Sequence, residues 1–218
     1  MAFFDFLSPT APALIERSTQ RLVDMLETAE TMFAASTRCL LDNEDVGIDL
    51  KALDDTINDG EREIRRSVLE HMAVNPVDDL SHSLLLLSVV QDAERCGDLA
   101  KSLAKASALA ERPRTGRHVD ALRRIRDHVT AIYPKTVQTL REGEAGPGRE
   151  VMGAHQRMKG DVAHFLNGVA SADDLTLNEG VVLTLGAQTI GRVSSHLSNV
   201  ASAVVMPFDL VRSSPQAA

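Results

Sequence analysis

The stretch that decides the fold class is residues 50–72, LKALDDTINDGEREIRRSVLEHM. Its apolar and small residues recur at steps of three and four, at Leu50, Leu53, Ile57, Gly60, Ile64, Val68 and Met72. Because an α-helix has about 3.6 residues per turn, this spacing places one stripe along a single helix face. No stretch of the chain shows the sustained apolar–polar alternation that is typical of β-strands. We therefore predict an all-α protein.

Prolines and short polar turns divide the helical periodicity into six segments, because proline cannot continue a helix hydrogen-bond ladder. We expect helices over residues 12–41, 47–73, 78–110, 116–142, 149–171 and 174–206. Turns are expected at 42–45, 75–76, 112–113 and 146–148, and residues 172–174 are expected to cap the last helix. Pro134 lies inside a helical pattern and predicts a kink there. Short turns between long helices favour antiparallel neighbours, and hence bundle packing.

Composition excludes several classes of protein. Aromatic residues make up only 3% of the 218, and the formal net charge is −8, so a platform for single-stranded nucleic acid is not expected. The longest apolar cluster, residues 84–90, is far below the roughly 18 residues that a membrane span requires. The start of the chain lacks the basic region of a secretory signal, so we expect a cytoplasmic protein with Cys39 and Cys96 reduced and buried. The role of Phe3, Phe4 and Phe6 near the start stays open.

The six predicted helices fall into two groups of three, at residues 1–111 and 112–218, and the charge differs between them. Residues 1–110 carry a net charge of −10 and residues 111–218 a net charge of +2. At an offset of 97 residues, Gln91, Arg95 and Ala104 align with Gln188, Arg192 and Ala201. We interpret the chain as two diverged three-helix repeats. The acidity of the first is either a solvated helical surface or a cation site.

Two motifs resemble those of the PhoU family. Residues 89–98, VVQDAERCGD, are similar to the family's repeated signature on the third helix of each three-helix bundle, and residues 54–61, DDTINDGE, are similar to its second-helix pattern. The resemblance is specific over about residues 50–106. It implies a non-enzymatic regulator of phosphate transport and phosphate-starvation signalling, which docks on a phosphate transporter or an associated sensor protein at the membrane and often forms a homodimer.

The acidic motif predicts a metal site. Glu94 and Asp98 are four residues apart and emerge on one helix face, and Asp54, Asn58 and Glu61 share a face of the preceding helix. Five oxygen-bearing side chains between two helices suit Fe, Zn, Mg, Mn or Ca, and the resemblance implies metal binding in some family members. The alternative is that Glu94 and Asp98 pair with Arg95 or Lys101.

The second repeat lacks these acids. The positions that match the five predicted ligands are Gly191, Ser195, His155, Lys159 and Val162. We therefore expect no second metal site, and the positive balance of this half either is structural or serves a partner or an anion.

Two rival functions remain open: a carboxylate-bridged metalloenzyme and a plain structural adaptor. Against the first, the chain has no Glu-x-x-His motif of the di-iron type. Arg123, Arg124 and Arg126 form a small basic patch, interpreted as a solvated surface or as a contact for an acidic partner.

Overall fold

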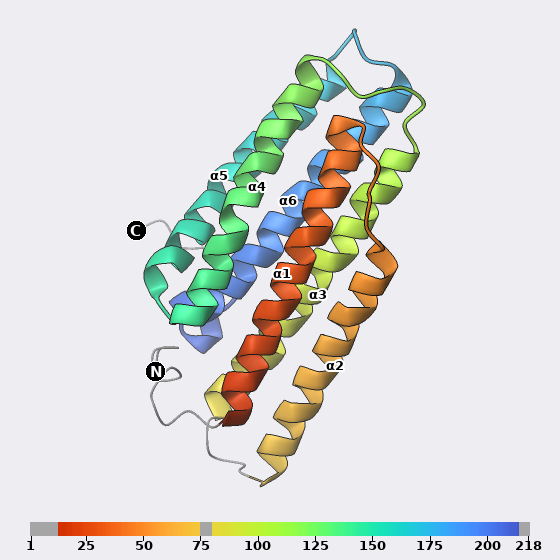
Figure 1. Ribbon diagram of the computed structural model, residues 1–218. Coiled ribbons are helices and arrows are strands. Elements are labelled where there is room, and N and C mark those ends of the chain that lie inside the picture. Colours follow the sequence, from red (N-terminus) through yellow and green to blue (C-terminus); the bar gives the residue numbers. More distant parts are fainter. Residues whose placement is uncertain (1–12, 75–79, 214–218) are drawn as a thin grey trace.

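The computed structural model describes residues 13–74 and 80–213, which form six long helices and one short 3₁₀ turn (Figure 1). The bounds are α1 Ala13–Asp42, α2 Leu50–Val74, α3 Leu80–Ala108, α4 Arg117–Glu142, α5 Ala145–Ala170, α6 Leu177–Val205 and η2 Phe208–Leu210. Within the described residues there are no strands, and the predicted all-α fold is confirmed. The predicted turn at 75–76 and the N-terminal phenylalanines lie outside the described residues.

The helices form two groups of three that are packed side by side. Helices α1, α2 and α3 contact one another, as do α4, α5 and α6, while α3 contacts α6 and α1 contacts α4. In Figure 1, α2 and α5 lie on opposite flanks, with the other four helices between them. One continuous cluster of buried apolar side chains runs through both groups. The two-bundle architecture is confirmed, and the division into repeats at residues 111 and 112 stays a prediction.

The start of α5 corrects one predicted turn. Residues 146–148 were expected outside a helix, but α5 begins at Ala145 and includes Pro147 in its first turn. Proline is tolerated there because the first N–H groups of a helix have no intrahelical acceptor. Gly148 faces α6 closely, and a Cβ at this position would lie 2.5 Å from Cγ2 of Val205. The glycine that suggested a turn instead allows a close helix contact.

The caps of two other helices also differ from the prediction. Helix α6 begins at Leu177, and its N-cap is Thr176 rather than a residue of 172–174. Thr176 and Glu179 form a capping box, in which each side chain accepts a hydrogen bond from the other's backbone N–H. Helix α2 begins later than predicted because the Asp49 carboxylate accepts the backbone N–H groups of Lys51 and Ala52, both at 3.0 Å.

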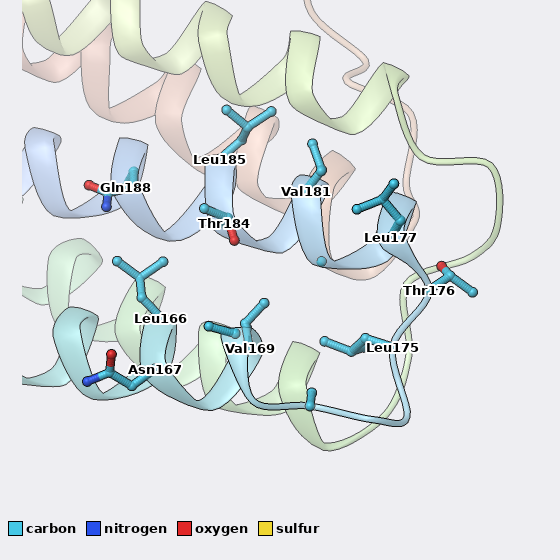
Figure 2. Close-up of a pocket in the computed structure, with 13 residues that line it drawn as sticks. Leu166, Asn167, Val169, Leu175, Thr176, Leu177, Val181, Thr184, Leu185 and Gln188 are labelled. Atoms are coloured by element: carbon cyan, nitrogen blue, oxygen red, sulfur yellow. The ribbon is translucent and has the colours of Figure 1, made fainter.

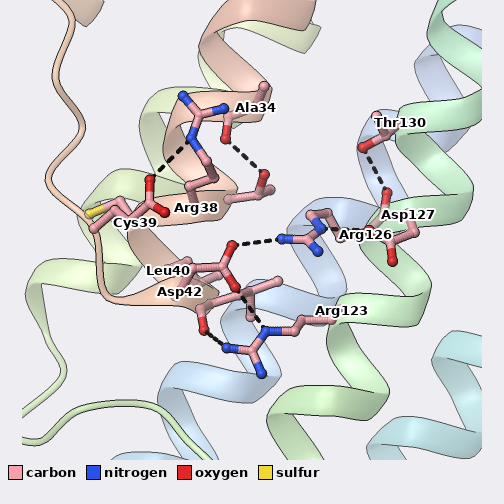
Figure 3. Close-up of polar contacts among 12 residues, drawn as sticks. Ala34, Arg38, Cys39, Leu40, Asp42, Arg123, Arg126, Asp127 and Thr130 are labelled. Carbon is pink, nitrogen blue, oxygen red and sulfur yellow. Dashed lines mark hydrogen bonds and ion pairs between the residues drawn. The ribbon is translucent and has the colours of Figure 1, made fainter.

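Two of the three arginines in the predicted basic patch are held by contacts within the protein, while Arg124 is exposed. Arg123 and Arg126 of α4 form ion pairs with Asp42 at the end of α1, at 2.8 and 2.9 Å (Figure 3). Arg123 also donates to the Leu41 carbonyl at 2.6 Å. Arg114 donates to the carbonyls of Cys39 and Leu40. These arginines satisfy the last carbonyls of α1, which have no partner inside the helix, and they tie the two helix groups together.

The remaining local predictions have mixed outcomes. Cys96 is buried, but Cys39 is only half-buried, and both are free thiols. Pro134 lies inside α4 without ending it, and the predicted kink stays a prediction. Across the described residues, no helix has the length and apolar character to cross a membrane.

Candidate functional site

The predicted acidic site lies where α2 packs on α3. Gly97 permits this approach, because a Cβ there would lie 2.8 Å from Cδ1 of Ile57 on α2. Asp54, from α2, and Asp98, from α3, contact the same Lys101 ammonium. The structure therefore brings together the two helix faces that the spacing of the acids predicted.

Lys101 lies between the two aspartates. Its Nζ is 2.6 Å from Oδ2 of Asp54 and 3.0 Å from Oδ1 of Asp98. Asn58 donates to the same Asp54 oxygen, over 3.3 Å. Arg95 pairs with the other oxygen of Asp98 at 2.9 Å. The alternative of ion pairs with Arg95 and Lys101 is thus confirmed for Asp98, and Glu94 also pairs with Arg95, over 3.5 Å.

Glu94 and Glu61 complete the acidic face. The pKa of Glu94 rises to about 7, first because burial disfavours its charged form and then because the Asp98 carboxylate lies beside it. For Asp98, burial pushes the pKa upward, but hydrogen bonds from Lys101 and Glu94 hold the pKa below its ordinary value. Glu61 pairs with Arg65 on its own helix at 2.8 Å. The Glu94 carboxyl therefore keeps its proton to a higher pH than an ordinary glutamate does.

These contacts decide how well the residues fit a metal ion. A metal needs several open oxygen or nitrogen donors converging on one point. Here an ammonium lies between Asp54 and Asp98, and Glu61 is turned to Arg65. In residues 13–74 and 80–213, no group of three or more His, Cys, Asp and Glu side chains is placed to hold a metal ion. This arrangement does not fit a metal while Lys101 is in place, and the metal site stays a prediction.

The matching region of the second half lies between α5 and α6 and is hollow. Its cavity of about 310 Å³ is lined by all five positions aligned with the acidic set, His155, Lys159, Val162, Gly191 and Ser195, together with Arg192. His155 contacts Oγ of Ser194 at 3.1 Å, and burial followed by the Lys159 charge lowers the pKa of His155 to about 4. No carboxylate lines the cavity. The half without acids thus presents cationic side chains at the equivalent place.

The sequence reasoning missed a second cluster, centred on Asp92 of α3. The Asp92 side chain is 3% exposed and accepts hydrogen bonds from Nδ1 of His196 at 2.8 Å and from Nδ2 of Asn199 at 2.9 Å, both on α6. Arg212, beyond η2, donates to its other oxygen from Nε and Nη2, at 3.0 and 2.6 Å. Burial raises the pKa of Asp92, but these three partners outweigh it and hold the pKa below its ordinary value. The sequence offered one signal for this cluster, which is that the charged residue Asp92 stands beside the apolar stripe of α3.

The fold and this site define an all-α bundle of two three-helix groups with an ion-paired acidic motif on its third helix. Residues 22–107 match the family model of the PhoU domain. The resemblance to the PhoU family that the motifs indicated is thereby confirmed.

Two solved structures share the fold. PhoU from Pseudomonas aeruginosa superposes with a TM-score of 0.81 at 20% identity, over 88% of this chain and 96% of that one. The phosphate transport system regulatory protein PhoU from Streptococcus pneumoniae gives a TM-score of 0.78 at 14% identity, over 88% and 93%. Among curated proteins, a search finds no match to this chain. At these identities the structural likeness establishes the fold alone.

Proposed function

We propose that this chain is a cytoplasmic regulator of phosphate transport and phosphate-starvation signalling that acts by binding other proteins rather than by catalysis. The observation that carries the proposal is the match of residues 22–107 to the PhoU domain, on a fold shared with two PhoU structures over 88% of the chain. The partner in this proposal is a phosphate transporter or its associated sensor protein at the membrane, and the regulator is a homodimer.

The acidic cluster has a structural role in this proposal. Lys101 and Arg95 together balance the charges of Asp54 and Asp98 at the contact of α2 and α3, so the pair of helices is held without an outside cation. The rival proposal, a carboxylate-bridged metalloprotein, requires Lys101 to leave and a metal to take its place. Elemental analysis of the purified protein beside a double variant, Glu94→Ala with Asp98→Ala, tests this rival. Equal metal content in both proteins counts against metal binding at the site.

The regulatory proposal is tested in cells of the source organism that lack the gene. Expression from a phosphate-starvation promoter and uptake of labelled phosphate are measured at high and low phosphate, with and without the restored gene. We expect the null strain to lose the difference between the two conditions and the restored gene to recover it. An unchanged response in the null strain refutes the proposal. Tagged protein captured with a phosphate-transport component in one condition only would identify the partner.

A further inference from the structure

One face of the second helix group is open along most of its length. The cavity beside Arg192 shares Leu166 and Gln188 with a second cavity, of about 680 Å³, at the turn between α5 and α6. Because the two hollows meet at these residues, they form one groove between α5 and α6, named the α5–α6 groove below.

The far end of the groove is apolar and exposed. Leu177, Val181 and Leu185 follow one another at steps of four along α6, and their exposed fractions are 87%, 45% and 41%. Figure 2 shows these three side chains in a row on α6, with Leu166, Val169 and Leu175 on the α5 side. No charged residue lines this part of the groove. Fully burying one such side chain contributes about 1.5–3 kcal/mol of favourable free energy, so this exposed row favours contact with an apolar partner surface.

The other end of the groove is cationic. Arg192 and Lys159 lie on facing helices, and Arg192 makes no ion pair or hydrogen bond with the described residues. Neither cavity is lined by an aspartate or a glutamate. The groove therefore offers apolar contacts at one end and a positive charge that lacks a carboxylate at the other.

We propose that the α5–α6 groove binds an amphipathic helix of a partner protein that carries an apolar stripe and, at one end of the stripe, a carboxylate. From Leu177 to Arg192 the groove is about 23 Å long, which a helix of about 16 residues spans. Val181 and Arg192 are 11 positions apart, so they lie about three turns apart on the same face of α6. The partner's carboxylate is accordingly placed about 11 residues from its apolar anchors. Gly180 and Gly191 lie on the side of α6 that faces α5, where a Cβ would meet Val169 at 3.9 Å and Val162 at 3.3 Å.

A second copy of this chain is the weaker occupant. A second copy also carries the exposed row of Leu177, Val181 and Leu185, but its groove is lined by no carboxylate that would pair with Arg192. The inference rests on the proposed function only for the identity of the partner: docking on a transporter or sensor protein would use this groove.

The test uses a fluorescent, capped helical peptide of about 16 residues with leucines at steps of three and four and two glutamates at one end. Anisotropy is measured against the full chain, and a Kd of about 10–100 μM is expected. Leu177→Glu and Arg192→Glu are each expected to weaken binding by about tenfold or more. The matched controls are Leu69→Glu and Arg66→Glu on exposed positions of α2, which are expected to leave the Kd unchanged.

A second peptide of opposite charge tests whether Arg192 recognises a carboxylate. This peptide carries two lysines in place of the glutamates, and it is expected to bind wild type poorly and Arg192→Glu better. No binding of the first peptide, or equal binding to wild type and to both groove variants, overturns the proposal. Sedimentation that shows wild type as a dimer and Leu177→Glu as a monomer overturns it in favour of a second copy. Intact phosphate regulation in cells that carry both groove substitutions refutes the groove while leaving the proposed function standing.

Discussion

Replacing Asp92 with alanine should strongly destabilise the protein, although Asp92 lies outside the predicted site. Its carboxylate joins α3 to α6 and to the segment after η2, and it accepts hydrogen bonds from His196, Asn199 and Arg212. Removing one partner of a buried charge pair costs about 3–5 kcal/mol. The Arg212 side chain is 42% exposed, so water can take over its contacts, and its share falls toward the roughly 0–1 kcal/mol of a surface pair.

Most of the remaining cost of removing the carboxylate comes from its two donors on α6, His196 and Asn199. A buried donor left without an acceptor costs about 1–3 kcal/mol, and His196 and Asn199 are each partly buried. We therefore expect Asp92→Ala to lower the free energy of unfolding by about 2–4 kcal/mol at pH 7. Urea titration followed by circular dichroism measures this change. The control is Asp209→Ala, at an exposed acid of η2, which should change stability by less than about 0.5 kcal/mol.

The contribution of Asp92 to stability should also depend on pH. The folded-state pKa of Asp92 is below its ordinary value, so its stabilising contribution is complete above about pH 4 and is lost as the pH falls through the folded pKa. The stability difference between wild type and Asp92→Ala should be large at pH 5 and shrink below pH 4. A difference under about 1 kcal/mol at pH 7, or one that does not shrink in acid, refutes the assigned role.

Three further outcomes follow from particular contacts. Gly148→Ala should lower the free energy of unfolding, measured by urea titration, by about 1–3 kcal/mol, because its Cβ would meet Val205 and Thr139. The control, Gly160→Ala, should be neutral or stabilising, because a Cβ there meets nothing within 4 Å. Equal effects of the two substitutions would contradict the close contact at Gly148. Tyr133→Phe should change stability little in thermal melting, because the buried hydroxyl makes no well-formed hydrogen bond among the described residues and has only the Cys96 thiol, a weak partner, beside it. A clear loss of stability would show that this contact matters. Lys101→Met should retain more manganese or zinc after dialysis than wild type, because it frees Asp54 and one oxygen of Asp98, whose other oxygen stays paired with Arg95. Equal metal content would show that Lys101 does not fill the place of a cation.

The helices could be predicted because their signal is local. A stripe such as Ile57, Ile64 and Val68 is fixed by residues within a few turns, and all three are buried as expected. Helix ends were harder to predict, because the same residue types serve both inside and outside a helix. Pro147 is acceptable in a first turn, and Thr176 outcompetes the aspartates before it because Glu179 completes its capping box.

The acidic site shows which contacts a sequence can and cannot reveal. The faces of Asp54 and Asp98 follow from helical spacing, and Lys101 was a foreseeable partner because it lies three residues from Asp98. The Asp92 cluster was not foreseeable, since its donors lie more than a hundred positions away. Spacing along one helix predicts neighbours on that helix, whereas contacts between the two helix groups depend on how the groups pack.

The two helix groups differ in what their matching helix pairs leave open. Between α2 and α3, Lys101 from the same helix pair forms ion pairs with Asp54 and Asp98, so this acidic cluster already has a positive partner within the chain. Between α5 and α6, the matching positions carry no acids and line a hollow in which Arg192 has no carboxylate. A charge that the chain itself neutralises contributes little to recognition. An unpaired charge beside an exposed apolar row favours binding of a partner with an opposite charge and an apolar surface. The half with the weaker family motif is therefore the half with the surface best suited to bind another protein.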